Sequence, residues 1–351
     1  MAAFTAIDNP GEFFSTTLYT GTGSSNAITG VGFQPDLVWC KQRTDPTASH
    51  CLVDAPRGVD NFIATNAATA EVNDAYNVTA FGADGFTVGA SSGSADINVS
   101  TETYCGWCWK GGTTTGIAGS PSITPTAYSF SQDSGFSVIR WTGDEQASAT
   151  IPHGLASAPH CVFTKSLDSG SDWGVYHFHA DATAPEDYAF KFNTTAIRAD
   201  QVAMWTDTQP SSTLVTLGTE NRSNNIGDMI AYCFAPVQGF SKFGTYVGNG
   251  NVDGPFVYTG FRPAFIITKD ADNGLGNWNI FNSKTLGYNE ENRLMTCNQT
   301  AAEIDRNMDL LSNGFKPRDS GQSNENNSNY IYLSFAEAPF VNSNSVPCNA
   351  R

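Results

Sequence analysis

The sequence has few of the features that mark membrane, secreted or nucleic-acid-binding proteins. No stretch approaches eighteen consecutive apolar residues, so no transmembrane helix is expected. Residues 1–10 lack the basic start and apolar core of a signal peptide, which predicts a soluble protein made in a cytosol. Only 18 lysines and arginines stand against 34 acidic residues, giving a net charge of −16, and they gather on no single segment. Without a basic footprint, nucleic-acid binding is not expected either.

Segments typical of helices are scarce as well. Charged residues make up only 15% of the 351 residues, whereas Gly (33), Phe (23) and Tyr (12) are abundant. Most long intervals break on Gly, Pro, Asn or Asp within ten residues, which is typical of twisted strands joined by tight turns. The composition therefore predicts an all-β protein built from sandwiches or barrels.

The eight cysteines could in principle form four disulfides. Five of them, however, lie inside apolar, strand-like runs rather than in loops: Cys40, Cys105, Cys108, Cys161 and Cys233. Cysteines in such runs behave as small apolar core residues, and cytosolic proteins rarely contain disulfides. We therefore favour free, buried thiols.

One pattern occurs three times along the chain. An apolar run begins at a proline and ends six residues later at a lysine: Pro35 to Lys41, Pro159 to Lys165 and Pro263 to Lys269. A Phe-Ser pair that leads to an aromatic residue and a glycine lies 21 or 23 residues before each proline, at Phe14, Phe136 and Phe240. Each copy closes on an aromatic run, at 104–109, 229–234 and 330–335. The spacing predicts that one strand plan is used three times.

The distances between copies divide the chain into domains. Landmarks of the second and third copies lie 104 or 105 residues apart, whereas those of the first copy lie 122 to 127 residues before those of the second. The surplus matches a Gly/Thr/Ser/Pro-rich stretch, which predicts a flexible linker. The predicted organisation is a first repeat (1–110), a linker (111–130), a second repeat (131–236), a third repeat (237–340) and a C-terminal tail (341–351). Because residues 235–240 form only a short connection between the second and third repeats, we expect these two repeats to pack rigidly together.

Each repeat is predicted to be a compact β-sandwich of six to eight short strands with jelly-roll-like topology. The Pro-to-Lys runs are apolar throughout, as expected of strands buried on both faces, with the proline at the first strand position. Trp173 and Trp278, each twenty residues before an asparagine, are predicted core residues. An exposed tryptophan stacked on a sugar is the alternative. Asn66 has a setting similar to that of the two asparagines, Asn193 and Asn298.

Two pairs of residues have metal-ligand spacing. Cys105 and Cys108 form a CxxC pair, but residues three apart on a strand face opposite sides, and no second pair completes a zinc site, so core thiols are favoured. His177 and His179 could present two imidazoles on one strand face. With no third ligand evident, a solvent-facing or hydrogen-bonded pair is favoured.

Residues 270–274 (DADNG) resemble the opening of a calcium-binding loop. Phe281 stands where the bidentate glutamate should be, and no helix is expected on either side. An acidic turn between strands is favoured, since Asp172 lies in the corresponding loop of the second copy.

The sequence predicts no catalytic, cofactor-binding or metal-binding residue, and its ligand-binding residues are unknown. No Gly-x-Ser-x-Gly elbow occurs, and no acidic residue recurs at an equivalent position of all three copies, as a duplicated active site would require. The recurrent polar residues are Lys41, Lys165 and Lys269. Each would end a strand with its stem buried and its ammonium in water, which favours a structural role.

Three segments of the third copy resemble a known group of proteins: FSKFGTYVGNG (240–250), GPFVYTGFRPAF (254–265) and YIYLSFAEAPF (330–340). They are similar to the repeat-bearing structural proteins of marine tailed bacteriophages, which are described as tail-fibre-like or uncharacterised virion proteins. The likeness covers the whole chain, including residues 2–10 and the tail to Arg351, and is loosest in the second copy. The resemblance implies a place in the virion after synthesis in the host bacterial cytoplasm, and it supplies no site residues.

Our leading hypothesis is a non-enzymatic virion surface protein, a tail fibre or receptor-binding component whose loops touch a host glycan or envelope protein. Three related units, multiplied by homo-oligomerisation, would convert weak contacts into avidity. The alternative is a capsid or tail decoration (head-fibre) protein with a purely structural role, whose three units mimic a trimer at a symmetry axis. A polysaccharide depolymerase is the third hypothesis. The expected partners are other virion proteins and the host surface, with no nucleic acid and no membrane insertion.

Overall fold

The computed structural model describes residues 5–91, 95–274, 276–285, 289 and 291–350. The first four residues of the predicted first repeat, which also belong to the phage-like segment 2–10, lie outside this range, as does Arg351 of the predicted tail. Nearly all regular structure consists of antiparallel strands, so the all-β prediction is confirmed. The two α-helices, α1 (Val202–Trp205) and α2 (Asn221–Asn224), have four residues each. Within the described residues, no helix has the length and apolar character to cross a membrane.

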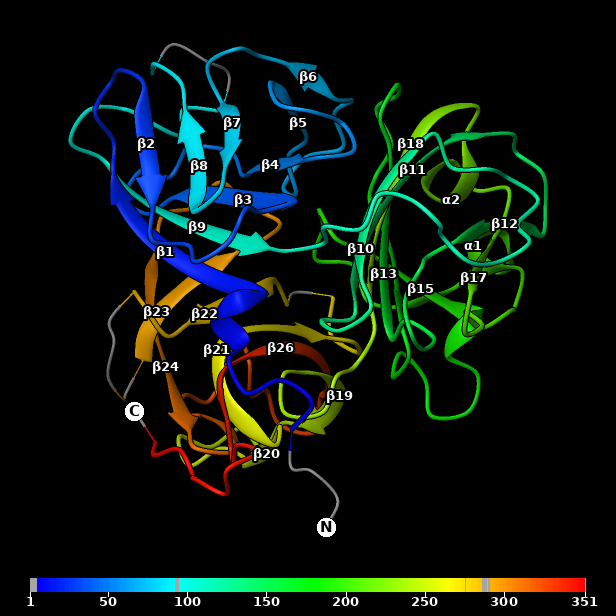
Figure 1. Cartoon of the computed structure of the whole chain (residues 1–351). Coiled ribbons are helices and arrows are strands. Elements are labelled where there is room, and N and C mark those ends of the chain that lie inside the picture. The colour runs from blue at the N-terminus through cyan, green and yellow to red at the C-terminus, as the bar shows by residue number, and fades with distance from the viewer. Residues whose placement is uncertain (1–4, 92–94, 275, 286–288, 290, 351) are drawn as a thin grey trace.

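Three successive parts of the chain form three units around a common centre (Figure 1). The main sheet of the first unit has the order β1 (Phe14–Thr20), β9 (Thr103–Trp109), β3 (Leu37–Gln42) and β4 (Cys51–Asp54). A smaller sheet packs on one face of it, in the order β2 (Asn26–Thr29), β8 (Gly85–Val88) and β7 (Val78–Gly82). A separate pair is formed by β5 (Asn61–Phe62) and β6 (Val72–Asn73).

The second and third units have larger main sheets. In the second unit the order is β10 (Ala127–Ser131), β11 (Phe136–Gly143), β18 (Gly227–Phe234), β13 (Cys161–Ser166), β14 (Gly174–His177), β15 (Tyr188–Lys191) and β16 (Ala199–Asp200). The pair β12 (Ala149–Pro152) and β17 (Leu214–Leu217) packs over this sheet. In the third unit one barrel-like sheet has the order β19 (Ser241–Val247), β26 (Asn329–Pro339), β21 (Phe261–Asp270), β22 (Trp278–Asn282), β23 (Glu291–Thr296), β24 (Ile304–Leu311), β25 (Gly314–Pro317) and β20 (Val257–Tyr258).

The same three strands lie together in every unit, which confirms the predicted repeat. Their orders are β1-β9-β3, β11-β18-β13 and β19-β26-β21. The Pro-to-Lys runs form the last strand of each trio, and their lysines lie at equivalent register positions, opposite Cys105, Ile230 and Ile331. Pro35 and Pro159 precede their strands, whereas Pro263 lies inside β21. The ladder shifts register at Pro263, and a bulge is where a missing N–H is tolerated.

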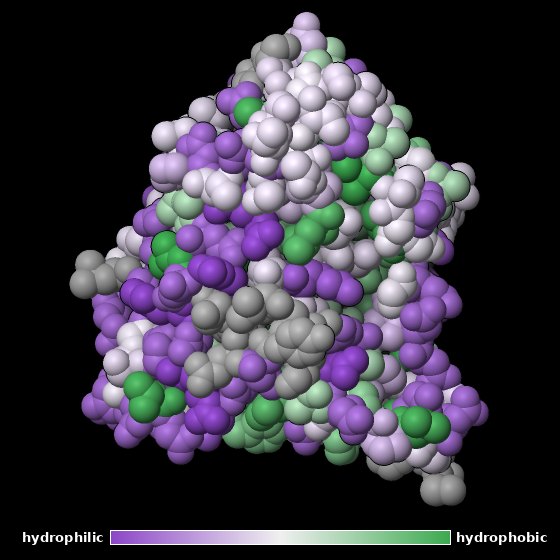
Figure 2. All heavy atoms as spheres, turned by 90° about the vertical axis from the view of Figure 1, so that its left-hand side faces the viewer, coloured by the Kyte–Doolittle hydropathy of each residue, from purple (hydrophilic) through white to green (hydrophobic). Residues whose placement is uncertain are grey.

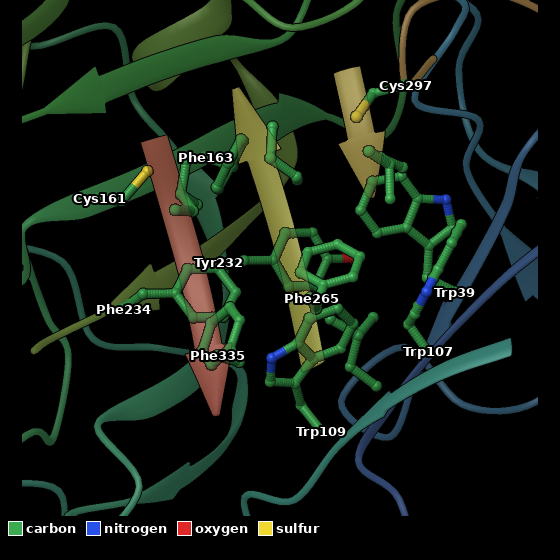
Figure 3. Close-up of a cluster of buried hydrophobic side chains, with 14 of the residues drawn as sticks. Trp39, Trp107, Trp109, Cys161, Phe163, Tyr232, Phe234, Phe265, Cys297 and Phe335 are labelled. Atoms are coloured by element: carbon green, nitrogen blue, oxygen red, sulfur yellow. The ribbon is translucent and has the colours of Figure 1, made fainter. Parts of the chain in front are cut away.

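One face of each main sheet points to the centre, where a single hydrophobic core, the shared core, joins the three units (Figure 3). Trp109, Phe234 and Phe335 lie at equivalent positions of β9, β18 and β26 and meet at the centre. Their ring centroids are 6.2 Å apart for Trp109 and Phe234, and 5.6 Å apart for each of the other two pairs. The void left among the central side chains measures about 30 Å³, roughly the volume of one water molecule. The centre is therefore a packed core.

The opposite face of each main sheet contributes to a separate core inside its own unit. Alternate residues of β3 divide between the two cores, with Leu37 and Trp39 in the shared core and Val38 and Cys40 in the core of the first unit. Because both faces are covered, these strands read as continuous apolar runs instead of alternating ones. The prediction of strands buried on both faces is confirmed.

Polar contacts between the units form a cycle around the centre. Trp173 donates its Nε1–H to the Ala64 carbonyl of the first unit (2.9 Å), and Trp278 donates to the Lys191 carbonyl of the second unit (3.0 Å). His50 holds the equivalent position in the first unit. Its Nδ1 accepts the Trp39 Nε1–H (2.8 Å), so its Nε2–H donates to the Thr296 carbonyl of the third unit (2.9 Å). Each unit is thus bonded to the next.

The recurrent asparagines orient these three side chains. Each accepts, through Oδ1, the backbone N–H of the aromatic residue in its own unit: Trp173 to Asn193 (3.0 Å), Trp278 to Asn298 (3.0 Å) and His50 to Asn66 (2.9 Å). This contact explains the twenty-residue spacing seen in the sequence. Trp173 and Trp278 are fully buried, so the core prediction is confirmed and the sugar-stacking alternative is wrong.

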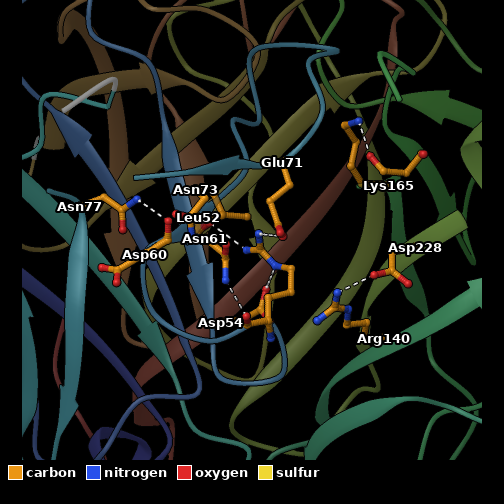
Figure 4. Close-up of polar contacts among 12 residues, drawn as sticks. Leu52, Asp54, Asp60, Asn61, Glu71, Asn73, Asn77, Arg140, Lys165 and Asp228 are labelled. Carbon is orange, nitrogen blue, oxygen red and sulfur yellow. Dashed lines mark hydrogen bonds and ion pairs between the residues drawn. The ribbon is translucent and has the colours of Figure 1, made fainter. Parts of the chain in front are cut away.

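A buried ion pair adds to the contact between the first and second units (Figure 4). Arg57 Nε lies 2.5 Å from Asp54 Oδ2, and Arg57 Nη1 lies 3.0 Å from Glu71. Tyr232 of the second unit donates its hydroxyl to Asp54 Oδ2 (2.7 Å). Since the charges and their remaining hydrogen-bonding atoms are paired, removal of one member would leave an uncompensated buried charge.

The segment 111–130 is packed on the second unit and differs from the predicted flexible linker. Ile123 donates its N–H to the Thr150 carbonyl (3.0 Å) and buries its side chain in the core of that unit. Strand β10 lies at the edge of the main sheet. Asp36 of the first unit accepts hydrogen bonds from the Gly111 N–H (2.9 Å) and the Ser129 hydroxyl (2.7 Å). The small and polar residues of the segment therefore form turns and hydrogen bonds on both sides.

Removing the indole N–H of Trp278 should destabilise the protein. Trp278→Phe keeps an aromatic ring but takes away the donor to the Lys191 carbonyl, so we expect the free energy of unfolding to fall by about 1–2 kcal/mol more than the ring change alone would cause. Trp205→Phe is the matched control, because Trp205 is equally buried and its Nε1 has no hydrogen-bond partner. Urea denaturation measures both variants. Equal losses would contradict a stabilising role of this bond.

Candidate functional site

The two residue pairs with metal-ligand spacing, Cys105/Cys108 and His177/His179, have structural roles. Cys105 lies in the shared core and Cys108 in the core of the first unit, so their side chains point to opposite faces of β9, as predicted. None of the eight cysteines forms a disulfide, and seven are buried. Burial raises the pKa of the Cys108 thiol well above its usual range, which keeps it protonated and unreactive. The prediction of free, buried thiols is confirmed.

The histidine pair is hydrogen-bonded, as favoured from the sequence. His177 is fully buried at the end of β14; its Nδ1 accepts the His179 N–H (3.1 Å), and its Nε2 lies 3.2 Å from the Tyr332 carbonyl of the third unit. His179 follows the end of the strand, so the two rings do not share a strand face. Burial lowers the pKa of His177 to about 3. Across the described ranges, no group of three or more His, Cys, Asp or Glu residues is arranged to hold a metal ion.

The three recurrent lysines are fully buried, so the prediction that their ammonium groups reach water is wrong. Main-chain carbonyls take the place of water. The bonds run from Lys41 Nζ to Gln42 (2.8 Å) and Thr300 (2.9 Å), from Lys165 Nζ to Ser166 (2.7 Å) and Ser169 (3.3 Å), and from Lys269 Nζ to Gly276 (2.8 Å) and Thr195 (3.0 Å). Thr300 belongs to the third unit and Thr195 to the second. Two of the lysines therefore bond their own unit to a neighbour.

These lysines make no ion pair within the described part of the chain. Burial lowers the pKa of each of the three to about 8, and more distant carboxylates, Asp45, Asp172 and Asp270 respectively, oppose the shift. Carbonyl dipoles compensate a buried charge less well than water does. The burial of the three lysines thus has an electrostatic cost, although two of them also join their unit to a neighbour.

Residues 270–274 form a turn between β21 and β22, as favoured from the sequence. Asp270 Oδ1 accepts the N–H groups of Asp272 and Asn273, both at 2.9 Å. Asp272 lies 3.5 Å from Arg198 of the second unit. Phe281 is fully buried in β22 and cannot serve as a ligand. The corresponding Asp172 pairs with Lys191 (2.7 Å).

A surface groove on the third unit is the best-formed candidate for ligand contact. It has a volume of about 400 Å³ and is lined by 236–239, Ser241, Lys242, 258–260 and Phe340. Lys242 donates from Nζ to the Tyr258 carbonyl (2.7 Å), and its ammonium lies 4.9 Å from the centre of the Tyr258 ring. The groove lies beside β20, at the lower end of the molecule in Figure 1. We call it the Tyr258 groove.

Exposed aromatic residues gather at this groove. Tyr258 lines the groove and is 53% exposed, and Phe256, two residues before it in the sequence and outside the groove lining, is 49% exposed. Tyr76 of the first unit is the third exposed aromatic residue among the described ones. The side of the molecule formed by the first and third units is otherwise mostly hydrophilic or neutral, with apolar side chains in small groups (Figure 2). No sequence signal singled out Phe256 or Tyr258, because exposed and buried aromatic residues look alike in a β-rich sequence. The arrangement suits contact with a surface ligand, since it offers apolar rings, a cation and main-chain polar groups.

The buried lysines give the stability an unusual pH dependence. Between pH 8 and the ordinary lysine value of 10.5, the folded protein carries neutral lysines while the unfolded chain is still protonated, so the burial penalty fades as the pH rises. Relative to Lys269→Met, the wild type should gain up to about 3 kcal/mol of unfolding free energy between pH 7 and pH 10. Urea denaturation of both proteins at each pH cancels the titration of other groups. The exposed Lys284→Met is the control, and a difference that stays constant or falls with pH would contradict the assignment.

A family model described as a domain of unknown function, DUF7483, matches residues 9–339. No significant match was found among curated proteins or among solved structures. The matched range extends from just before β1 to the last residue of β26, so it contains the strands of all three units. The chain therefore belongs to the DUF7483 family.

Proposed function

We propose that this protein is a non-enzymatic surface component of a tailed-phage virion, a tail fibre or receptor-binding protein that contacts the host cell. The virion context comes from the resemblance of residues 240–250, 254–265 and 330–340 to phage structural proteins. The Tyr258 groove is the observation that supports host contact.

Two aromatic residues on one segment expose apolar ring surface to water, which is unfavourable, and a bound partner would cover that surface. Phe256 and Tyr258 lie two residues apart, and the groove beside them is large enough for a sugar unit or a peptide side chain. Aromatic rings are the side chains most often responsible for binding energy at interfaces. A rigid body supports such a site, because the shared core keeps the groove in a fixed orientation to the other two units.

Removing both aromatic rings should weaken the binding of the protein to host cells. Labelled wild-type protein and the double variant Phe256→Ser/Tyr258→Ser are compared for adsorption to cells, with an expected loss of tenfold or more, which corresponds to about 1.4 kcal/mol. Tyr76→Ser, which removes an equally exposed ring from the first unit, is the control. Protease and periodate treatment of the cells separates an envelope protein from a glycan as the ligand.

The adhesin proposal fails if the wild-type protein coats no cells and antibodies against it do not block phage adsorption. Binding that survives the double variant would remove the Tyr258 groove from the proposal.

The arrangement of the three units favours a second candidate, a decoration or head-fibre protein. Trp109, Phe234 and Phe335 meet at one centre as the subunits of a trimer would meet at a three-fold axis. A body of this shape fits a three-fold position of a capsid or tail. A whole-particle reconstruction separates the candidates: density on a three-fold axis supports decoration, and density at the tail tip supports adhesion.

A further inference from the structure

The turn between β21 and β22 contains a buried carboxylate oxygen with no hydrogen-bond partner. Asp270 is only 1% exposed; its Oδ1 accepts two backbone N–H groups, but its Oδ2 is buried and makes no hydrogen bond. None of the ion pairs within the described residues includes Asp270. Burial raises the pKa of the neighbouring Tyr330, and the Asp270 carboxylate adds to that rise, but the Tyr330 hydroxyl is neutral. The Lys269 ammonium attracts the carboxylate without forming an ion pair with it, so the charge of Asp270 is only partly balanced. A buried, unpaired carboxylate is costly unless an ion or ordered water completes it.

Asp270 lines a cavity of about 200 Å³ together with Asn273, Gly276, Gln322 and Glu325. The lining therefore brings together two residues with carboxylates and two with side-chain amides. Glu325 is exposed at the rim, which gives an ion a path of entry. The volume leaves room for a cation and several waters.

A second carboxylate that has a buried oxygen without a hydrogen-bond partner lies next to this cavity. Asp319 lines an adjoining cavity of about 400 Å³ that shares Gln322 and Glu325 with the first. Its Oδ1 accepts the Gly321 N–H (2.9 Å), and its Oδ2 is buried without a partner. Burial raises the pKa of Asp319, and Glu325 adds to the rise. Arg306 lines the outer cavity and offsets part of the negative charge.

Only the third unit has an acidic residue directly after its recurrent lysine; the other two units have a neutral residue at this position. The residue after the recurrent lysine is Gln42 in the first unit and Ser166 in the second. Ser166 Oγ is bonded to Ser169 Oγ (2.9 Å) and to Asn225 Nδ2 (3.2 Å), so neutral side chains fill this place in the second unit. The fold can thus be completed here without a charge, and the buried aspartate of the third unit calls for another explanation.

We propose that this cavity binds Ca²⁺, with the carboxylates of Asp270 and Glu325 as anionic ligands and oxygens of Asn273 and Gln322 as neutral ones. Calcium takes six to eight oxygen ligands and tolerates irregular geometry, and waters complete such a set. A set without nitrogen or sulfur ligands disfavours zinc, and Mg²⁺ demands a stricter octahedron than Ca²⁺ does. The Lys269 ammonium is held by the carbonyls of Gly276 and Thr195 and makes no ion pair with Asp270, so the carboxylate stays available to the ion.

Calcium addition to purified protein tests the site. Isothermal titration with CaCl₂ and the melting temperature in EDTA or 1 mM Ca²⁺ are measured for the wild type and for Asp270→Asn. The amide keeps Oδ1 as acceptor for the turn, so the variant should fold. We expect Ca²⁺ to raise the melting temperature of the wild type and to bind the variant at least tenfold more weakly. In EDTA the variant should melt at or above the wild type, because the unpaired charge is gone.

Asp272→Asn is the matched control from the same turn, since the Asp272 carboxylate faces Arg198 and Asn329 instead of the cavity. Its calcium binding should equal that of the wild type, whereas Glu325→Gln at the rim should weaken binding. Absence of calcium-dependent heat and of any thermal shift in the wild type would overturn the proposal. Undiminished binding by both Asp270→Asn and Glu325→Gln would overturn it as well.

Discussion

The structure depends on one constraint: each main sheet is apolar on both faces, and its own unit can cover only one of them. The strands β3 and β13 are buried along their whole length, and β21 is buried at every residue except Arg262. The outer face is covered by a small sheet in the first unit, by a strand pair in the second and by other strands of the same barrel-like sheet in the third, and the inner face remains to be removed from water. Three such faces turned toward one another solve the problem together, with Trp109, Phe234 and Phe335 in contact at the centre. The three repeats therefore form one body, in agreement with a family match that spans them all.

The polar contacts follow from this arrangement. Because the sheets surround a common centre, the side chains of His50, Trp173 and Trp278 each face a carbonyl of a neighbouring unit. These three contacts form the cycle. Features that the three units do not share distinguish one unit from another. The exposed aromatic residues at the Tyr258 groove and Asp270, whose buried Oδ2 has no hydrogen-bond partner, both belong to the third unit. We infer that the repeat maintains the body and that the third unit carries the functions proposed for it.

Much of the fold could be predicted because spacing and apolar runs are local signals. The Pro-to-Lys runs, the aromatic closing strands, the opposed Cys105 and Cys108 and the buried tryptophans all follow from strand geometry. The burial of Lys41 and Lys269 could not be predicted, since the carbonyls that hold them, at Thr300 and Thr195, come from other units. The attachment of segment 111–130 was missed because Gly- and Thr-rich composition is shared by linkers and by turns. The groove and the calcium cavity depend on loops that meet only in the folded chain.

The central claim is that the three repeats unfold as one unit through the shared core, and amide hydrogen exchange of a core variant tests it most directly. Phe335→Ala removes a third-unit ring from the centre and should cost about 3–5 kcal/mol of unfolding free energy. If the core is shared, amides of β9 and β18 should lose protection by the same amount as those of β26. Loss of protection confined to the third unit would contradict the account.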